Sequence, residues 1–252
     1  MTLPFAGRSC LVTGAGSGIG AATAGLLAER GASIAVVGLP GDPLDETVGA
    51  IEKTGGIAVA IAADVSVADE MQHAVDRTVA EFGALDLAVN AAGISGGEFP
   101  LHEEPVDDWN QVLSVNLFGV FHSLRAEIGA MLASGRGGSI VNIASVQATN
   151  PLSRRTAYTA SKFGLIGLTK VAAKDYAEHG IRINALSPGI TDTPMMRAGG
   201  ATADAIAAVV PVKRVAEPVE MARGAAYLLS DEAGYVTGAE LVIDGGLLLR
   251  PT

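Results

Sequence analysis

Short apolar runs alternate with longer segments of helical periodicity along the first third of the chain. The apolar runs lie at residues 9–13, 33–37, 57–62 and 85–89. Continuous apolar runs of this length are typical of parallel strands that are buried on both faces. Strand–helix units in tandem, joined by right-handed crossovers, predict a doubly wound α/β sheet. Ligands bind such sheets outside the carboxyl ends of the strands, so we expect functional residues directly after these runs.

The alternation continues to the end of the chain and indicates one domain over residues 1–252. The chain has 252 residues, of which 49% are hydrophobic, enough to bury the core of one large domain. The further elements that we expect are a helix over 106–134, a strand over 139–143, a helix over 156–179, a strand over 181–186, helices near 203–209 and 219–229, and a strand near 241–244.

A glycine cluster lies where the first expected strand meets the first helix. It reads Gly14-Ala-Gly16-Ser-Gly18-Ile-Gly20, with the spacing G-x-x-x-G-x-G rather than G-x-G-x-x-G. Glycines at such a junction allow a tight turn, let the backbone approach a pyrophosphate and expose the helix N-terminus to it. The cluster lacks the Gly-Lys-Ser/Thr of a P-loop, and Ser17 is not framed as a hydrolase nucleophile. The cluster therefore predicts a dinucleotide site.

A serine, a tyrosine and a lysine follow the strand expected at 139–143. Ser145 lies at its carboxyl end, and Tyr158 and Lys162 are four residues apart, on one face of a helix. A unit charge about 4 Å from the phenol is worth about 4 kcal/mol at the effective dielectric of a protein surface. We therefore expect Lys162 to lower the pKa of Tyr158 toward neutrality, where a phenol acts as a general acid or base. Alone, the pair is also typical of an ordinary surface helix.

Together these features resemble the short-chain dehydrogenase/reductase family over essentially the whole chain. The resemblance rests on Thr13-Gly-x-x-x-Gly-Ile-Gly20, Asn90-x-Ala-Gly93, Asn116, Ser145, Tyr158-x-x-x-Lys162 and Pro188-Gly189. It implies a single-domain Rossmann-type parallel sheet of seven strands in the order 3-2-1-4-5-6-7, and NAD(P)-dependent interconversion of a secondary alcohol and a ketone. One departure is Ala91, where the family often has a second asparagine.

The resemblance also implies residue roles. Tyr158 would exchange a proton with the substrate oxygen, and Ser145 would orient that oxygen. Lys162 would bind the nicotinamide ribose, and Asn116 would hold a water that links Lys162 to solvent. The implied dinucleotide-binding residues are Gly14, Ser17, Gly18, Ile19, Gly20, Gly38, Leu39, Asp64, Val65, Asn90, Ala91, Gly93, Tyr158, Lys162, Pro188, Gly189 and Thr193. The candidate substrate-binding residues are Ser145, Gln147, Tyr158 and Met195, with Ile94, Ser95, Leu152 and Met196 as further pocket candidates.

The end of the second expected strand bears on which dinucleotide is bound. An acidic residue there favours NAD, whereas an arginine accommodates the 2′-phosphate of NADP. Gly38 and Leu39 occupy these positions, and Ser17 stands where the glycine loop is often basic in NADP-dependent members of the family. The 2′-phosphate would meet no cation, and Asp42 is close by in the sequence. We therefore favour NAD over NADP, with Asp42 or the backbone of Gly38 and Leu39 contacting the ribose.

Charge and composition narrow the range of partners. The net charge of −10 disfavours nucleic acid as a partner. The chain has no run approaching about 18 apolar residues and no signal-peptide pattern, which favours a cytoplasmic protein that acts without a membrane. The single Cys10 excludes an internal disulfide, and the histidines show no metal-ligand spacing, so no metal is expected. Arg154 and Arg155 are interpreted as solvated loop charges, with pairing to an anionic substrate as the alternative.

Oligomeric state and catalytic competence are the remaining predictions. We expect a homotetramer in which the helices over 106–134 and 156–179 pack at a two-fold interface, because Gly119, Gly164 and Gly167 would permit close approach. The alternative function is a non-catalytic dinucleotide-binding sensor or scaffold of the same fold. Such a protein would be expected to lack Ser145, Tyr158 or Lys162, and this chain has all of them.

Overall fold

The computed structural model describes residues 3–200 and 207–249. Its strands form one sheet in the order β3-β2-β1-β4-β5-β6-β7, and each pair of neighbours is parallel. The predicted fold class and strand order are therefore confirmed. The strands are β1 (Ser9–Thr13), β2 (Ser33–Gly38), β3 (Ile57–Ala62), β4 (Leu87–Asn90), β5 (Gly138–Ile143), β6 (Ile181–Pro188) and β7 (Glu240–Ile243).

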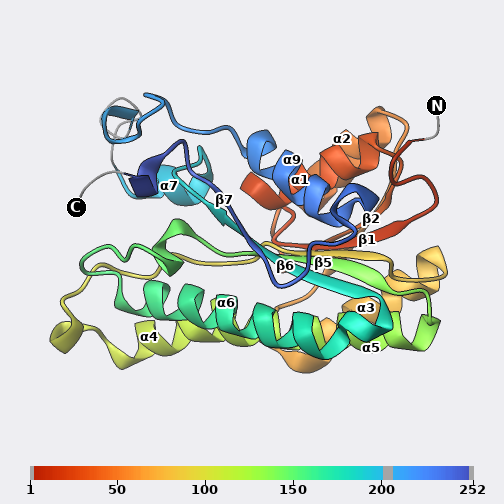
Figure 1. The fold of residues 1–252 in the computed structure, drawn as a ribbon, viewed down its shortest axis with the longest axis horizontal. Coiled ribbons are helices and arrows are strands. Elements are labelled where there is room, and N and C mark those ends of the chain that lie inside the picture. Colours follow the sequence, from red (N-terminus) through yellow and green to blue (C-terminus); the bar gives the residue numbers. More distant parts are fainter. Residues whose placement is uncertain (1–2, 201–206, 250–252) are drawn as a thin grey trace.

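Helices cover both faces of the sheet (Figure 1). On one face lie α1 (Gly18–Glu29), α2 (Leu44–Lys53) and α9 (Pro218–Leu229). On the other lie α3 (Ala68–Phe82), α4 (Val106–Leu113), α5 (Gly119–Ser134) and α6 (Thr156–Tyr176). The short helix α7 (Pro194–Ala198) follows β6. The helix expected near 203–209 falls mainly on residues 201–206, which lie outside the described part of the chain.

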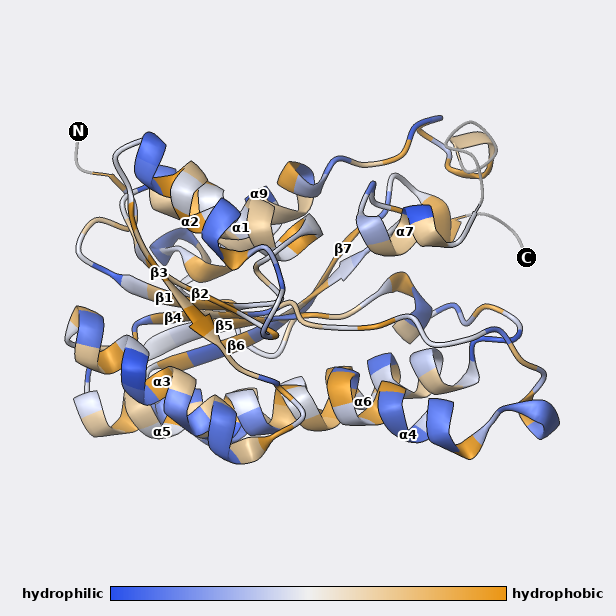
Figure 2. Ribbon diagram, turned by 180° about the vertical axis from the view of Figure 1, so that it is seen from behind, coloured by the Kyte–Doolittle hydropathy of each residue, from blue (hydrophilic) through white to orange (hydrophobic). Residues whose placement is uncertain are grey.

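Each face of the sheet has its own buried apolar cluster, which explains why the strands are apolar on both sides. Helix α3 shows how the pattern sets the packing. Its buried residues Met71, Ala74, Val75 and Thr78 recur at helical spacing, and its charged residues are exposed. Hydrophilic and hydrophobic stretches therefore alternate along the ribbon of α3 (Figure 2). Gly83 ends the helix in the left-handed conformation. None of the described helices is long and apolar enough to cross a membrane.

The helix expected over 106–134 is interrupted. Helix α4 ends at Leu113 and α5 begins at Gly119, and Ser114–Phe118 between them form a π-helical turn. Asn116 lies at the centre of this turn and is completely buried. Its amide accepts a hydrogen bond from the backbone N–H of Ile94 (2.8 Å) and donates one to the carbonyl of Ile94 (2.9 Å). Such π-helical turns within α-helices occur frequently at functional sites.

Candidate active site

A cavity of about 1100 Å³ opens along the carboxyl ends of the strands. All the predicted dinucleotide-binding residues except Asn90 line it. The predicted substrate-binding residues line it as well, together with the further candidates Ile94, Ser95, Leu152 and Met196. The fold therefore brings the glycine cluster, Ser145, Tyr158 and Lys162 to one cavity.

Close backbone packing shapes the glycine loop after β1. Gly14 has a φ of 62°, and a Cβ atom there would lie 2.8 Å from the Cα of Ala92. A Cβ atom on Gly20 would overlap the carbonyl oxygen of Gly14. The hydroxyl of Thr13 accepts hydrogen bonds from the N–H groups of Ala91 (3.1 Å) and Ala92 (3.3 Å), which ties this loop to the loop after β4. The loop therefore presents backbone and the N-terminus of α1 to the cavity, a cradle that fits a pyrophosphate.

An acidic side chain reaches the end of β2 from the following loop. The Oδ2 atom of Asp42 accepts a hydrogen bond from the N–H of Leu39 (2.9 Å). A Cβ atom on Gly38 would lie 2.7 Å from the same oxygen, so the glycine leaves room for the carboxylate. Asp42, Gly38 and Leu39 all line the cavity. A carboxylate is thus present where a ribose would be recognised, although the strand itself ends in glycine.

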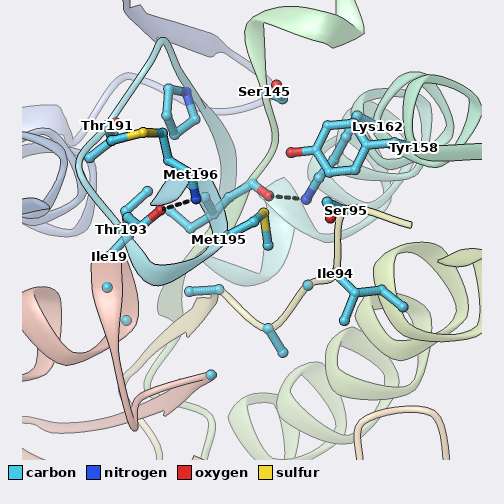
Figure 3. A pocket seen from close by; sticks show the side chains of 18 of the residues that line it. Ile19, Ile94, Ser95, Ser145, Tyr158, Lys162, Thr191, Thr193, Met195 and Met196 are labelled. Atoms are coloured by element: carbon cyan, nitrogen blue, oxygen red, sulfur yellow. Dashed lines mark hydrogen bonds between the residues drawn. The ribbon is translucent and has the colours of Figure 1, made fainter. Parts of the chain in front are cut away.

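The ends of β3 and β6 complete the wall of the cavity. The Oδ1 atom of Asp64 accepts hydrogen bonds from the N–H (2.8 Å) and hydroxyl (2.7 Å) of Ser66, which orient its carboxylate. Thr193 caps α7 by accepting a hydrogen bond from the N–H of Met196 (3.2 Å). This cap places Met195 and Met196 along the cavity opposite Tyr158 (Figure 3).

Ser145, Tyr158 and Lys162 lie together at the end of β5 and the start of α6 (Figure 3). The ammonium group of Lys162 donates a hydrogen bond to the carbonyl of Ile143 (2.9 Å) and lies 5.6 Å from the centroid of the Tyr158 ring. The hydroxyl of Ser145 accepts a hydrogen bond from the N–H of Gln147 (3.1 Å). The side-chain oxygen of Gln147 is buried and has no hydrogen-bond partner among the described residues.

The pKa of Tyr158 differs from the prediction. Burial raises it, while hydrogen bonding with Ser145 and the positive charge of Arg155 lower it. Lys162 is itself buried, which lowers its own pKa to about 8. The expectation that Lys162 brings the phenol toward neutrality is therefore wrong for this structure, because burial outweighs the nearby charges.

Two predicted site residues do not line the cavity. Asn116 lies behind the wall, where its amide fixes Ile94. Asn90 ends β4, but its amide donates hydrogen bonds to Glu127 (3.1 Å) on α5 and to the cross-strand Asn142 (2.9 Å). The prediction that Asn90 lines the dinucleotide site needs correction. The Asn90 side chain lies in the buried layer between β4 and α5 and is not part of the cavity lining.

Glu127 was not predicted from the sequence. Its side chain is completely buried, and burial raises its pKa to about 8. Its Oε1 atom and the Oδ1 atom of Asn90 have no hydrogen-bond partner within the described chain. The sequence feature that could have indicated a buried Glu127 is its place among the apolar positions of α5.

Arg155 is not a solvated loop charge. Its side chain is only 20% exposed and forms an ion pair with Glu98 (2.7 Å), and both residues line the cavity. Its guanidinium also donates weaker hydrogen bonds to the carbonyls of Ser95 and Gly96, each at 3.4 Å. Leu247 and Leu248, which were not predicted from the sequence, also line the cavity and lie in the short turn that follows β7. Their position after a strand end was the signal that could have found them.

Comparison with known proteins agrees with this geometry. The family model described as Enoyl-(Acyl carrier protein) reductase matches residues 14–248. The cyclohexanol dehydrogenase of Acinetobacter sp. (strain SE19) is 42% identical over 245 residues, which cover 97% of this chain and 96% of that protein. The chain belongs to the short-chain dehydrogenase/reductase family. The cis-4-hydroxycyclohexanecarboxylate dehydrogenase of Sinomonas cyclohexanicum is likewise 42% identical over 245 residues, covering 96% of this chain and 97% of that protein.

Solved structures give the same result. The crystal structure of levodione reductase has a TM-score of 0.94 and 35% identity, and the match covers 98% of this chain and 100% of that one. NAD⁺-bound xylitol dehydrogenase has a TM-score of 0.91 and 34% identity, with 96% and 99% covered. A dehydrogenase from Agrobacterium tumefaciens with bound NADP has a TM-score of 0.87 and 38% identity, with 98% and 99% covered. The chain is therefore an oxidoreductase, and the non-catalytic alternative is not supported.

Proposed function

We propose that this chain, acting as one domain over residues 1–252, interconverts a secondary alcohol and a ketone with NAD. The observation that carries the proposal is the meeting of Ser145, Tyr158 and Lys162 in a cavity whose other end is the glycine loop. The glycine loop, Asp42, Asp64 and Lys162 would hold the dinucleotide. When bound, the dinucleotide supplies the hydride acceptor or donor.

Proton transfer would be the task of Tyr158. In oxidation its phenolate takes the proton of the substrate hydroxyl, and in reduction its phenol returns one. The Ser145 hydroxyl accepts a hydrogen bond from the backbone N–H of Gln147. Its single proton, which bonds the Tyr158 phenol in this structure, would turn to the substrate oxygen when substrate binds. The positive charge of Arg155 favours the phenolate against the cost of burial. The Lys162 ammonium donates one hydrogen bond to the carbonyl of Ile143, so its other two N–H groups remain for the ribose hydroxyls.

The charge distribution supports NAD over NADP. Among the described residues that line the cavity, the basic ones are Arg155 and Lys162, which lie with Tyr158. At the other end Asp42 presents a carboxylate beside Gly38 and Leu39. A 2′-phosphate there would lack a charge-assisted hydrogen bond worth about 1.5–3 kcal/mol. We expect kcat/KM for NAD to exceed that for NADP by about tenfold at fixed ionic strength, and a preference for NADP would contradict the proposal.

The substrate end of the cavity suits an alicyclic secondary alcohol. Apolar side chains line it, namely Leu152, Met195, Met196, Val209, Leu247 and Leu248. The unpaired oxygen of Gln147 offers one acceptor for a polar substrate group. The similar dehydrogenases act on cyclohexanol and on a hydroxycyclohexanecarboxylate, which leaves the charge of this chain's substrate open. Absorbance of the reduced nicotinamide in the presence of a panel of cyclic and acyclic alcohols tests the proposal. No change with any secondary alcohol or ketone would contradict it.

We also propose a cytoplasmic homotetramer in which α5 and α6 form one interface. Large apolar side chains on these helices and on the π-helical turn before α5 are exposed by about half, namely Phe118, Phe121, Phe163 and Val171. The glycine explanation needs correction, because Gly119 packs on Val65 and Gly164 on Leu117 within the chain, and only Gly167 faces open space. Sedimentation at micromolar concentration should show a tetramer, and a monomer would contradict the proposal.

A further inference from the structure

The ion pair between Glu98 and Arg155 lies at the substrate end of the cavity. We infer that this pair selects uncharged alcohols over alcohols that carry a carboxylate. Glu98 is already ion-paired with Arg155, the cation with which a substrate carboxylate would need to pair. The inference rests on the proposed function, since it concerns the substrate of the same site. It assigns a specificity role to two residues outside the serine, tyrosine and lysine group.

The position of the Arg155 guanidinium is well defined by its surroundings. Arg155 precedes α6 at its N-cap position, three residues before Tyr158. Its side chain is 20% exposed and contacts Glu98 at 2.7 Å and the carbonyls of Ser95 and Gly96 at 3.4 Å. Its charge acts on the Tyr158 phenol. The guanidinium is therefore within electrostatic range of the reacting group and faces the cavity rather than bulk water.

Glu98 is held less firmly. Its side chain is 60% exposed, and its described polar contact is the ion pair with Arg155. Exposed partners of this kind contribute little to folding stability, about 0–1 kcal/mol. Replacing Glu98 is therefore expected to change substrate selection and to leave the free energy of unfolding nearly unchanged.

Arg155 is the one cation at the substrate end of the described cavity lining with which a substrate carboxylate could pair. Lys162 is bonded to Ile143 and, under the proposed function, its remaining donors serve the ribose. Asp42 and Asp64 lie at the ends of β2 and β3. Of the basic residues described in the lining, only Arg155 remains at this end. A substrate carboxylate would either displace Glu98 or lie beside a second negative charge. An uncharged ring meets neither penalty.

The test compares two substrates that differ by one carboxylate, cyclohexanol and cis-4-hydroxycyclohexanecarboxylate. The measured quantity is the ratio of their kcat/KM values, carboxylate over neutral. We expect Glu98→Gln to raise this ratio about tenfold, which is about 1.4 kcal/mol. The double variant Glu98→Gln/Arg155→Gln should lose the gain. Glu103→Gln removes the same charge from an exposed residue outside the cavity lining and serves as the matched control.

A binding measurement separates this inference from the proposed reaction. Calorimetry with cyclohexanecarboxylate and the enzyme saturated with NADH needs no turnover. Tighter binding to Glu98→Gln than to the wild type, absent in the double variant, supports the inference even if neither alcohol is oxidised, in which case the proposed function alone fails. An unchanged kcat/KM ratio and unchanged binding in Glu98→Gln would overturn the inference. A ratio that rises equally in Glu103→Gln would also overturn it, since the effect would then come from net charge.

Discussion

The two ends of the cavity are constructed differently. The end after β1 consists mainly of backbone, with Gly14 and Gly20 packed so closely that a side chain would collide with the loop itself. The end at β5 and α6 consists of side chains drawn from the loop after β4, from α6 and from the residues after β7. The comparison indicates that the dinucleotide end should tolerate almost no added atom, whereas the substrate end can be altered one side chain at a time.

The largest effect on dinucleotide binding is expected from Gly20→Ala. The added methyl group collides with the carbonyl oxygen of Gly14, so the loop must open and lose its contacts with a pyrophosphate. We expect NADH affinity, measured by fluorescence titration, to fall by about a hundredfold, roughly 2.8 kcal/mol. Gly25→Ala on the same helix is the control, because a Cβ atom there meets nothing within 4 Å. Wild-type affinity in Gly20→Ala would remove the distinction between the two ends.

A smaller effect is expected from Asp42→Asn, which changes the acidic side chain beside the end of β2. Asparagine can still accept the hydrogen bond of Leu39 but carries no charge. We expect kcat/KM for NAD to fall about tenfold, with a smaller loss for NADP. Asp45→Asn, at an exposed position outside the cavity lining, is the control. Equal losses with both dinucleotides would show that the Asp42 charge does not discriminate between them.

The smallest effect is expected from Arg155→Gln and concerns pH. In the wild type, alcohol oxidation should accelerate as pH rises and Tyr158 ionises, and ketone reduction should slow. Removing the positive charge of Arg155 disfavours the phenolate, so the apparent pKa at which alcohol oxidation accelerates should rise. Arg154→Gln, which changes the neighbouring arginine, should leave the profile in place. A lower apparent pKa in Arg155→Gln would contradict the claim that the charge of Arg155 stabilises the Tyr158 phenolate.

The same comparison explains what the sequence could and could not predict. The alternation of apolar runs predicted the sheet, and the glycine spacing predicted the loop after β1, because both depend on local geometry. The sign of the Tyr158 pKa shift could not be predicted, because it depends on burial by residues far along the chain. The pairing of Arg155 with Glu98 joins two loops that no periodic pattern connects. Asn90 was misplaced because a strand-end residue can turn its side chain beneath the sheet.

The central claim is that proton transfer depends on the Tyr158 hydroxyl at one end of the cavity, whereas most of the dinucleotide affinity comes from the glycine loop at the other. Tyr158→Phe tests it most directly, because only the hydroxyl is lost, and Tyr176→Phe on the same helix is the matched control. The measurement is kcat for alcohol oxidation together with the dissociation constant of NADH on the same preparations. The account predicts that Tyr158→Phe lowers kcat by roughly a thousandfold and changes the dissociation constant by less than about twofold. Near wild-type turnover, or an equal loss of NADH binding, would contradict it.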